Sequence, residues 1–154
     1  MAYARAPQYN SVMPILEDII QSEDRNLANY LYYSFLKIGN YLGIDTELIL
    51  SSNIKKDCSL KSYHKVISIC KILGGDKYYN SINGIPLYLP HLQEFQDAGI
   101  ELFFPKTHEI QYQQFKNEFV PNLSIIDVMM FNTREKCHQL LNEYDLLKGS
   151  EIEL

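Results

Sequence analysis

Apolar side chains recur at helical spacing in two long stretches of this 154-residue chain. The clearer set comprises Leu27, Leu31, Phe35, Ile38 and Leu42. Residues three and four apart share one face of a helix, so this set predicts a helix that directs an apolar face at a core. Ser22-Glu23-Asp24 is the expected N-terminal cap and acidic first turn, and Gly43 is the glycine at which the helix should end.

The second stretch has an inner face of Leu60, Tyr63, Ile67 and Cys70. Asp57 or Ser59 is the expected cap of this helix, and Gly74-Gly75 is its expected end. Shorter helices are expected at 13–20, 90–98, 124–131 and 133–147. Strands are expected at 46–50, 77–79 and 101–104.

Expected strands and helices alternate through the middle of the chain. This order favours right-handed crossovers and a parallel sheet. We therefore expect a helix-rich α/β fold, with a short, mostly parallel sheet of about three strands covered by helices. Because no linker or low-complexity segment interrupts the sequence, we expect a single domain over residues 1–154.

The composition argues against several classes of protein. A hydrophobic content of 46% is typical of a globular chain, and the net charge of −5 argues against a nucleic-acid binder. No apolar run approaches the ~20 residues of a membrane span, and no apolar signal core follows Met1, so we expect a cytoplasmic protein that does not span a membrane. The three cysteines are scattered, which fits a reducing compartment and predicts neither a zinc site nor a cofactor.

Polar loop residues follow each expected strand. They are Ser51, Ser52 and Asn53 after the first strand, Asn80, Ser81, Asn83 and Gly84 after the second, and Lys106 and His108 after the third. Ligands of open α/β sheets bind beyond the carboxyl ends of the strands, where hydroxyls, amides and a glycine suit phosphate or sugar hydroxyls. The alternative is that serine, asparagine and glycine are ordinary loop residues.

The lysines are concentrated in one part of the chain. Residues 53–77 contain six lysines against two aspartates, a net charge of +4 in a chain that carries −5 overall. A basic zone beside Ser51-Ser52 could hold an anionic ligand such as a nucleotide diphosphate. Lys55 and Lys56 lie in the loop and are the candidates for this role, whereas the later lysines are equally explained as the solvated face of a helix.

Ser124 and Asp127 have the spacing of a capping box, with aspartate in the place of the usual glutamate. Leu123 and Val128 fit the two positions of a hydrophobic staple at the same helix start. A catalytic Ser–Asp pair is the alternative, but no histidine is clearly placed to activate the serine. We interpret the segment as a structural helix start and assign no catalytic residue.

Several segments, taken in order, resemble the WbqC-like proteins, a family associated with bacterial surface-polysaccharide gene clusters. These segments are Tyr3-Ala4-Arg5-Ala6-Pro7, Leu42-Gly43-Ile44, Ser51-Ser52, 69–74, 79–84, Leu87-Tyr88, Gly99-Ile100, 112–115 and 119–127. Seven residues match recurrent positions of the family: Ser51, Ser52, Tyr79, Ser81, Gly84, Tyr88 and Asp127. Family members begin with an apolar strand and a Gln-Pro motif ahead of the Ala-Pro element, so the chain is expected to correspond to the C-terminal part of a family member.

The resemblance implies a role in O-antigen or related polysaccharide biosynthesis, with amino-acyl (glycine) transfer as the suggested reaction. We therefore predict a transferase that acts on a nucleotide-linked or lipid-linked sugar. The candidate ligand-binding residues are Lys55, Lys56 and Ser51 for phosphate, Asn80, Ser81 and Gly84 for the acceptor loop, and Tyr88 or Tyr112 for stacking on a ring. Ser52 and His108 are further candidates. The alternative is a non-catalytic binding or assembly module, whose protein partner docks on the surface left by the missing front portion.

Overall fold

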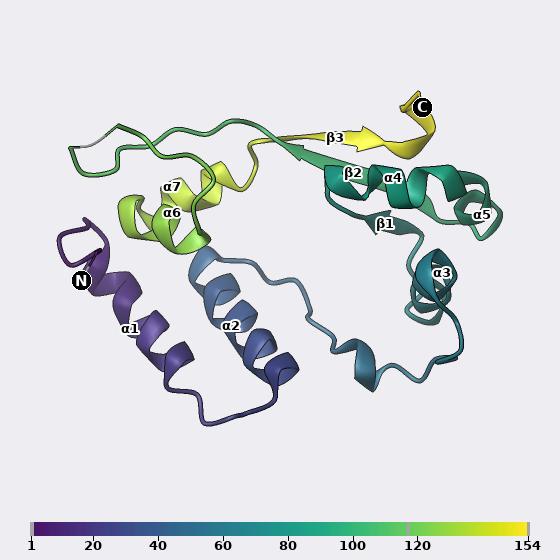
Figure 1. Cartoon of the computed structure of the whole chain (residues 1–154), viewed down its shortest axis with the longest axis horizontal. Coiled ribbons are helices and arrows are strands. Elements are labelled where there is room, and N and C mark those ends of the chain that lie inside the picture. The colour runs from purple at the N-terminus through teal and green to yellow at the C-terminus, as the bar shows by residue number, and fades with distance from the viewer. Residues whose placement is uncertain (1, 117, 154) are drawn as a thin grey trace. The chain divides into compact units, whose positions relative to one another are not determined.

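The computed structural model describes residues 2–116 and 118–153, and it divides the chain into two compact units (Figure 1). The helical unit comprises Met1–Leu50 and Glu109–Glu143, and the sheet unit comprises Ser51–His108 and Tyr144–Leu154. Each unit therefore consists of two separate segments of the chain, and each has its own hydrophobic core. The single domain over residues 1–154 stays a prediction.

The helical unit contains α1 (Tyr9–Ile20), α2 (Leu27–Leu42), α6 (Ile125–Phe131) and α7 (Arg134–Leu140). Its core is formed by Ala6, Val12, Leu42, Met129, Met130 and Cys137. Helix α2 has the predicted extent and ends at Gly43, whose φ of 73° is a left-handed conformation that glycine adopts without strain. Its cap is Asn26 rather than the predicted Ser22-Glu23-Asp24, since Oδ1 of Asn26 accepts from the amides of Ala28 and Asn29 at 2.9 and 3.2 Å.

Only the C-terminal half of the predicted apolar face of α2 is buried. Leu42 is buried and Ile38 packs against the core, whereas Leu27 and Phe35 are 70% and 63% exposed. The prediction that the whole face is directed at a core is therefore wrong for its first half. Helical periodicity specifies which residues share a face, but it does not specify how far along the helix a neighbouring element covers that face.

The sheet unit contains a three-stranded sheet in the order β1 (Lys77–Tyr79), β2 (Glu101–Thr107), β3 (Tyr144–Lys148). Strands β1 and β2 are parallel, and β2 and β3 are antiparallel. Its helices are α3 (Ser62–Ile72), α4 (Ile85–Tyr88) and α5 (Leu92–Asp97), with short 3-10 turns η1 (Ser51–Asn53), η2 (Ile82–Gly84), η3 (Leu89–His91) and η4 (Gly149–Glu151). The predicted helix-rich α/β fold with a short three-stranded sheet is confirmed, but the sheet is mixed rather than mostly parallel.

Two predicted elements are wrong. Residues 46–50 form no strand; Ile49 is 46% exposed, and an isolated apolar run is not stable as a strand without a partner to receive its hydrogen bonds. The helix predicted over 133–147 ends at Leu140, and the residues after it form β3 instead. Pairing with β2 overrides the local helical pattern of this segment because strand propensity depends on the neighbouring strand.

The helices of the sheet unit cover one face of its sheet. Leu102 and Phe104 of β2 point into a core with Leu89, Phe95 and Ile100, against which α3 also packs. The alternate residues of β2 point to the other face, where Phe103 lies between Tyr79 of β1 and Lys148 of β3. Among the described residues, no helix has both the length and the apolar character needed to cross a bilayer.

The serine cap of α6 generates a stability prediction. Ser124 has the extended backbone of an N-cap, and its Oγ accepts from the amide of Ile126 at 3.2 Å. We expect Ser124→Ala to lower the free energy of unfolding by about 1 kcal/mol, measured by urea denaturation. Ser11→Ala, at an exposed position inside α1, is the matched control and should change it by less than about 0.5 kcal/mol. Equal losses in the two variants would contradict the capping role.

Candidate functional site

Four of the predicted site residues lie together at the carboxyl end of β1. Asn80 follows β1 directly, and its amide continues the ladder by donating to the carbonyl of Phe103 at 3.0 Å. Its side-chain Nδ2 donates to the hydroxyl of Tyr78 at 2.8 Å. Ser81 precedes the turn η2, which ends at Gly84, and Tyr88 closes the short helix α4 that follows. The loop after β1 thus has polar side chains at the carboxyl end of a parallel strand, as predicted. We refer to Tyr78, Asn80, Ser81, Gly84 and Tyr88 as the β1 edge cluster.

Gly84 has a steric role in the β1 edge cluster. It is buried, and a Cβ added to it would lie 2.9 Å from Cγ of Asn80 and closer still to Oδ1. Glycine is therefore what allows the turn to pass beneath the Asn80 amide. This close approach keeps the amide aimed at the Tyr78 hydroxyl.

Tyr78 is the half-buried centre of the same cluster. Its ring contacts Tyr88 edge-on at 5.2 Å between centroids and stacks on Phe95 at 5.9 Å. Burial, followed by its hydrogen bond with Tyr88, raises the pKa of Tyr78 to about 12. At neutral pH this phenol is therefore a neutral hydrogen-bonding group, suited to orienting a hydroxyl or phosphate oxygen rather than to removing a proton.

The Ser51–Lys56 loop is not at a strand end, because the strand predicted before it is absent. Ser51 and Ser52 instead form the exposed 3-10 turn η1, and Nζ of Lys56 donates to the carbonyl of Ser51. Lys55 is exposed. The geometric reason for grouping this loop with Asn80 is thus wrong, while the assignment of its lysines to phosphate binding stays a prediction.

His108 and Tyr112 are not part of the β1 edge cluster. Tyr79 pairs with Phe103, so His108 lies roughly 16 Å further along the strand direction. There its Nε2 is 3.0 Å from Oδ1 of Asp145, which lies on the adjacent strand β3. Tyr112 belongs to the helical unit, where its hydroxyl donates to Oδ2 of Asp127 at 2.7 Å.

Asp127 is the polar centre of the helical unit, and the sequence patterns missed this role. Its side chain is 3% exposed, and its carboxylate accepts from the hydroxyl of Tyr3 at 3.0 Å, from the hydroxyl of Tyr112 and from Nε2 of Gln114, both at 2.7 Å. The expected capping box is therefore right for Ser124, which caps α6, and wrong for Asp127, whose carboxylate turns inward. The one signal in the sequence was that Tyr3, Tyr112 and Asp127 each fall in a segment that carries the family resemblance.

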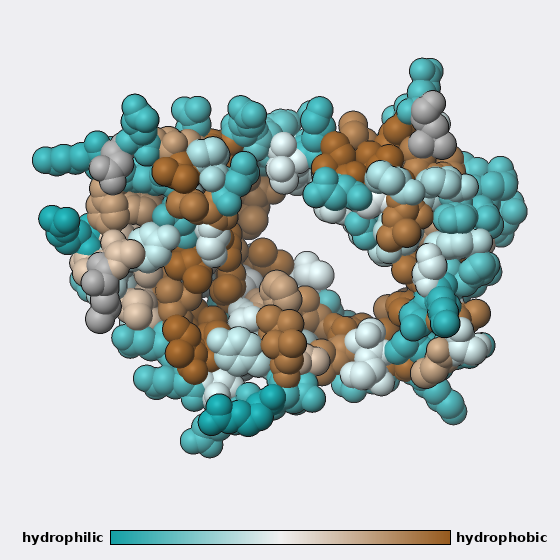
Figure 2. Space-filling view, viewed as in Figure 1, coloured by the Kyte–Doolittle hydropathy of each residue, from teal (hydrophilic) through white to brown (hydrophobic). Residues whose placement is uncertain are grey.

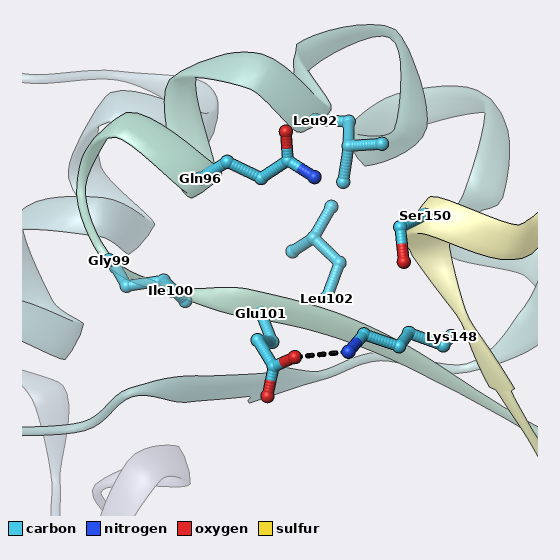
Figure 3. Close-up of a pocket in the computed structure, with 8 residues that line it drawn as sticks. All are labelled: Leu92, Gln96, Gly99, Ile100, Glu101, Leu102, Lys148 and Ser150. Atoms are coloured by element: carbon cyan, nitrogen blue, oxygen red, sulfur yellow. Dashed lines mark ion pairs between the residues drawn. The ribbon is translucent and has the colours of Figure 1, made fainter.

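The sheet unit has a cavity of about 330 Å³ at the amino end of β2 (Figure 3). Eight residues line it: Leu92, Gln96, Gly99, Ile100, Glu101, Leu102, Lys148 and Ser150. Such a volume lies at the small end of the range for ligand sites. Ligands of open α/β sheets bind at the opposite, carboxyl ends of the strands, so the β1 edge cluster is the better candidate site. Among residues 2–116 and 118–153, no three histidine, cysteine or acidic side chains are grouped so that they could hold a metal ion.

The sequence model of the WbqC-like protein family matches residues 1–139. The chain belongs to the WbqC-like protein family. The match spans all the segments named above, from Tyr3 to Asp127, and includes most of both units. No curated protein and no solved structure matches the chain.

The close approach at Gly84 generates a prediction for this WbqC-like protein. Gly84→Ala should push the Asn80 amide away from Tyr78 and lower the free energy of unfolding by about 1 kcal/mol, the worth of one net hydrogen bond. In an Asn80→Ala background the same substitution should cost much less, because the obstructing amide is gone. A double-mutant cycle by urea denaturation measures this coupling. Additive effects of the two changes would contradict the steric role.

The pKa of Tyr78 generates a second prediction. A folded-state pKa of about 12, above the ordinary value of 10, means that the unfolded chain releases this proton first. The stability that Tyr78 contributes should be fully present below pH 10 and be lost as the pH rises through about 12. Tyr78→Phe removes the group, so its unfolding free energy should fall less steeply than that of the parent between pH 10 and 12. Parallel curves for the two proteins, measured by denaturant titration at each pH, would count against this assignment.

Proposed function

We propose that this WbqC-like protein acts in a transferase reaction on a nucleotide-linked or lipid-linked sugar during the biosynthesis of bacterial O-antigen or a related surface polysaccharide. The observation that supports this proposal most directly is the β1 edge cluster, where Asn80 and Ser81 present an amide and a hydroxyl at the carboxyl end of a parallel strand. Family membership supports the pathway, through the association of WbqC-like proteins with polysaccharide gene clusters.

The chemistry of the cluster suits a sugar. Ser81 is exposed, and beside it the half-buried Asn80 directs its amide at Tyr78, on a turn in which Gly84 leaves room for that amide. Tyr78 and Tyr88 lie behind them and are held by aromatic contacts with the core residue Phe95. A fixed set of neutral donors and acceptors recognises hydroxyl groups by hydrogen bonding. Lys55 and Lys56 supply positive charge for a phosphate in the same unit.

We propose amino-acyl transfer, with glycine as the simplest group, as the reaction. A sugar hydroxyl or amine would attack the acyl carbon of an activated donor, and the bond from that carbon to the donor's leaving group would break. The proton lost by the attacking group would pass to the leaving group or to solvent. The role proposed for the β1 edge cluster is to hold the acceptor, and no residue is assigned as the base.

A non-catalytic binding or assembly module is the second candidate function. The observation that favours it is the uncovered first half of α2, where Leu27, Leu31 and Phe35 lie four residues apart and are all exposed. Figure 2 shows apolar side chains reaching the surface over this helix. A continuous exposed apolar face is typical of protein–protein interaction sites.

The test is a thermal-unfolding screen of the purified chain with nucleotide sugars, lipid-linked sugar analogues and glycyl-adenylate mimics. A ligand at ~100 times its Kd should stabilise the unit that binds it by about 2.7 kcal/mol. We expect stabilisation by at least one sugar conjugate, and expect Ser81→Ala and Lys55→Ala to reduce it while leaving the unfolding midpoint of the free protein within error.

Two matched variants serve as controls in this screen. Ser11→Ala and Lys136→Ala change exposed residues of the helical unit and should preserve the ligand-induced shift. No shift with any sugar conjugate would contradict the transferase proposal. In that case concentration-dependent self-association or partner capture that Phe35→Glu abolishes would support the assembly module.

A further inference from the structure

The outer face of the sheet, which the helices of the sheet unit leave uncovered, has an ordered row of side chains. Tyr79 of β1 pairs with Phe103 of β2, and Phe103 pairs with Lys148 of β3. Directly opposite residues of neighbouring strands point to the same face, so these three side chains form one line across all three strands. In the adjacent row, Lys77 pairs with Glu101.

The row is a stack. The rings of Tyr79 and Phe103 are 5.2 Å apart between centroids and inclined by 18°, a distance at which two rings overlap face to face with an offset. On the other side of Phe103, the Lys148 ammonium lies 6.0 Å from the ring centroid, within the range of a cation–π contact. Lys148 therefore contacts one end of the aromatic pair formed by Tyr79 and Phe103 on the outer face of the sheet.

Glu101 fixes that cation. It forms an ion pair with Lys148, and Figure 3 shows both side chains on the side of β2 away from Leu92 and Gln96. Their hydrogen bond raises the pKa of Lys148 and lowers the pKa of Glu101, so both groups are charged at neutral pH. The order of the stack is thus carboxylate, ammonium, Phe103 and Tyr79.

Tyr79 is the open end of the stack. Strand β1 pairs with β2 alone, so Tyr79 lies on an edge strand. Its side chain is 51% exposed, and its hydroxyl makes no hydrogen bond to any residue of the described ranges 2–116 and 118–153. One face of the Tyr79 ring is thus covered by Phe103, while the opposite face is open to solvent.

Lys77 is the cation nearest this open face in the sequence of β1. Lys77 precedes Tyr79 by two residues, which places the two side chains on the same face, about 7 Å apart along the strand. Lys148, at the other end of the stack, is paired with Glu101 and also interacts with Glu151, so Lys77 is the cation that lies beside the open ring face. A flat ring with a phosphate attached a few ångströms away matches this arrangement of a ring and a cation.

We propose that Tyr79 is a stacking platform for the base of a nucleotide, and that Lys77 holds its phosphate. This inference rests on the proposed function, because it assigns the nucleotide of a nucleotide-linked sugar to the outer face of β1.

The experiment measures binding of uridine and adenosine 5′-monophosphate by calorimetry, with saturation-transfer NMR on the base protons. Stacking on one aromatic ring contributes about 1–3 kcal/mol, so Tyr79→Ala should weaken binding about 5- to 150-fold. Tyr79→Phe keeps the ring and should remain within about threefold of the parent. Tyr144→Ala removes a tyrosine of β3 that is 41% exposed and is the matched control, with unchanged affinity expected. Circular-dichroism melts establish that each variant is folded.

Two further ligands separate the base from the phosphate. Ribose 5-phosphate lacks the base, so it should bind at least tenfold more weakly than the nucleotides and respond to Lys77→Ala but not to Tyr79→Ala. The nucleosides lack the phosphate and should respond to Tyr79→Ala alone. Equal affinity of parent and Tyr79→Ala for nucleotides, or ribose 5-phosphate binding as tightly as they do, would overturn the platform. So would the absence of nucleotide binding at millimolar concentration.

The two proposals fail separately. If lipid-linked sugars stabilise the chain while nucleotides do not bind, the platform is overturned and the proposed transferase function stands. If nucleotides bind in a Tyr79-dependent manner while no sugar conjugate stabilises the protein beyond its nucleotide part, the platform stands and the transferase function fails.

Discussion

A buried carboxylate holds the helical unit together. Asp127 accepts hydrogen bonds from Tyr3 near the N-terminus and from Tyr112 and Gln114 in the long connection before α6. Gln114 also exchanges two hydrogen bonds with the backbone of Val120, which ties the connection to itself. A buried polar group costs free energy unless it is hydrogen-bonded, and these three donors satisfy the side chain of Asp127. Burial and this carboxylate also raise the pKa of Tyr112 to about 12, which keeps the phenol a donor at neutral pH.

In the sheet unit the corresponding constraint is strand β2. It pairs on both sides, and its alternation sends Leu102 and Phe104 to the core while Phe103 joins the outer stack. One strand therefore positions both the covered face and the uncovered face. The β1 edge cluster depends on the same pairing, because the Asn80 amide donates to β2 before its side chain turns toward Tyr78.

The sequence predicted those features that depend on local interactions. The extent of α2, the glycines at which helices end, the strands at 77–79 and 101–104 and the loop after β1 all follow from periodicity and turn chemistry. What it missed depends on distant partners. Strand β3 exists because β2 offers an edge, and residues 46–50 lack such a partner. The inward turn of Asp127 requires Tyr3, more than a hundred residues away, and local spacing predicted a capping box there. The stack at Tyr79 likewise needs the register of two strands.

The division of each unit between two segments of the chain has a consequence for how the protein folds. Strand β3 is separated from β2 by the whole of Glu109–Glu143, the second segment of the helical unit. During synthesis the chain therefore completes the last part of the helical unit before the final strand of the sheet is available, and until then β2 has an unsatisfied edge. Bringing β3 to β2 closes a long loop, which costs conformational entropy that grows slowly with the length of the loop. If the intervening segment folds first, fewer flexible residues separate the two strands, and this cost is smaller. Formation of the sheet, and with it the row that ends at Tyr79, is thus coupled to folding of the other unit through chain connectivity.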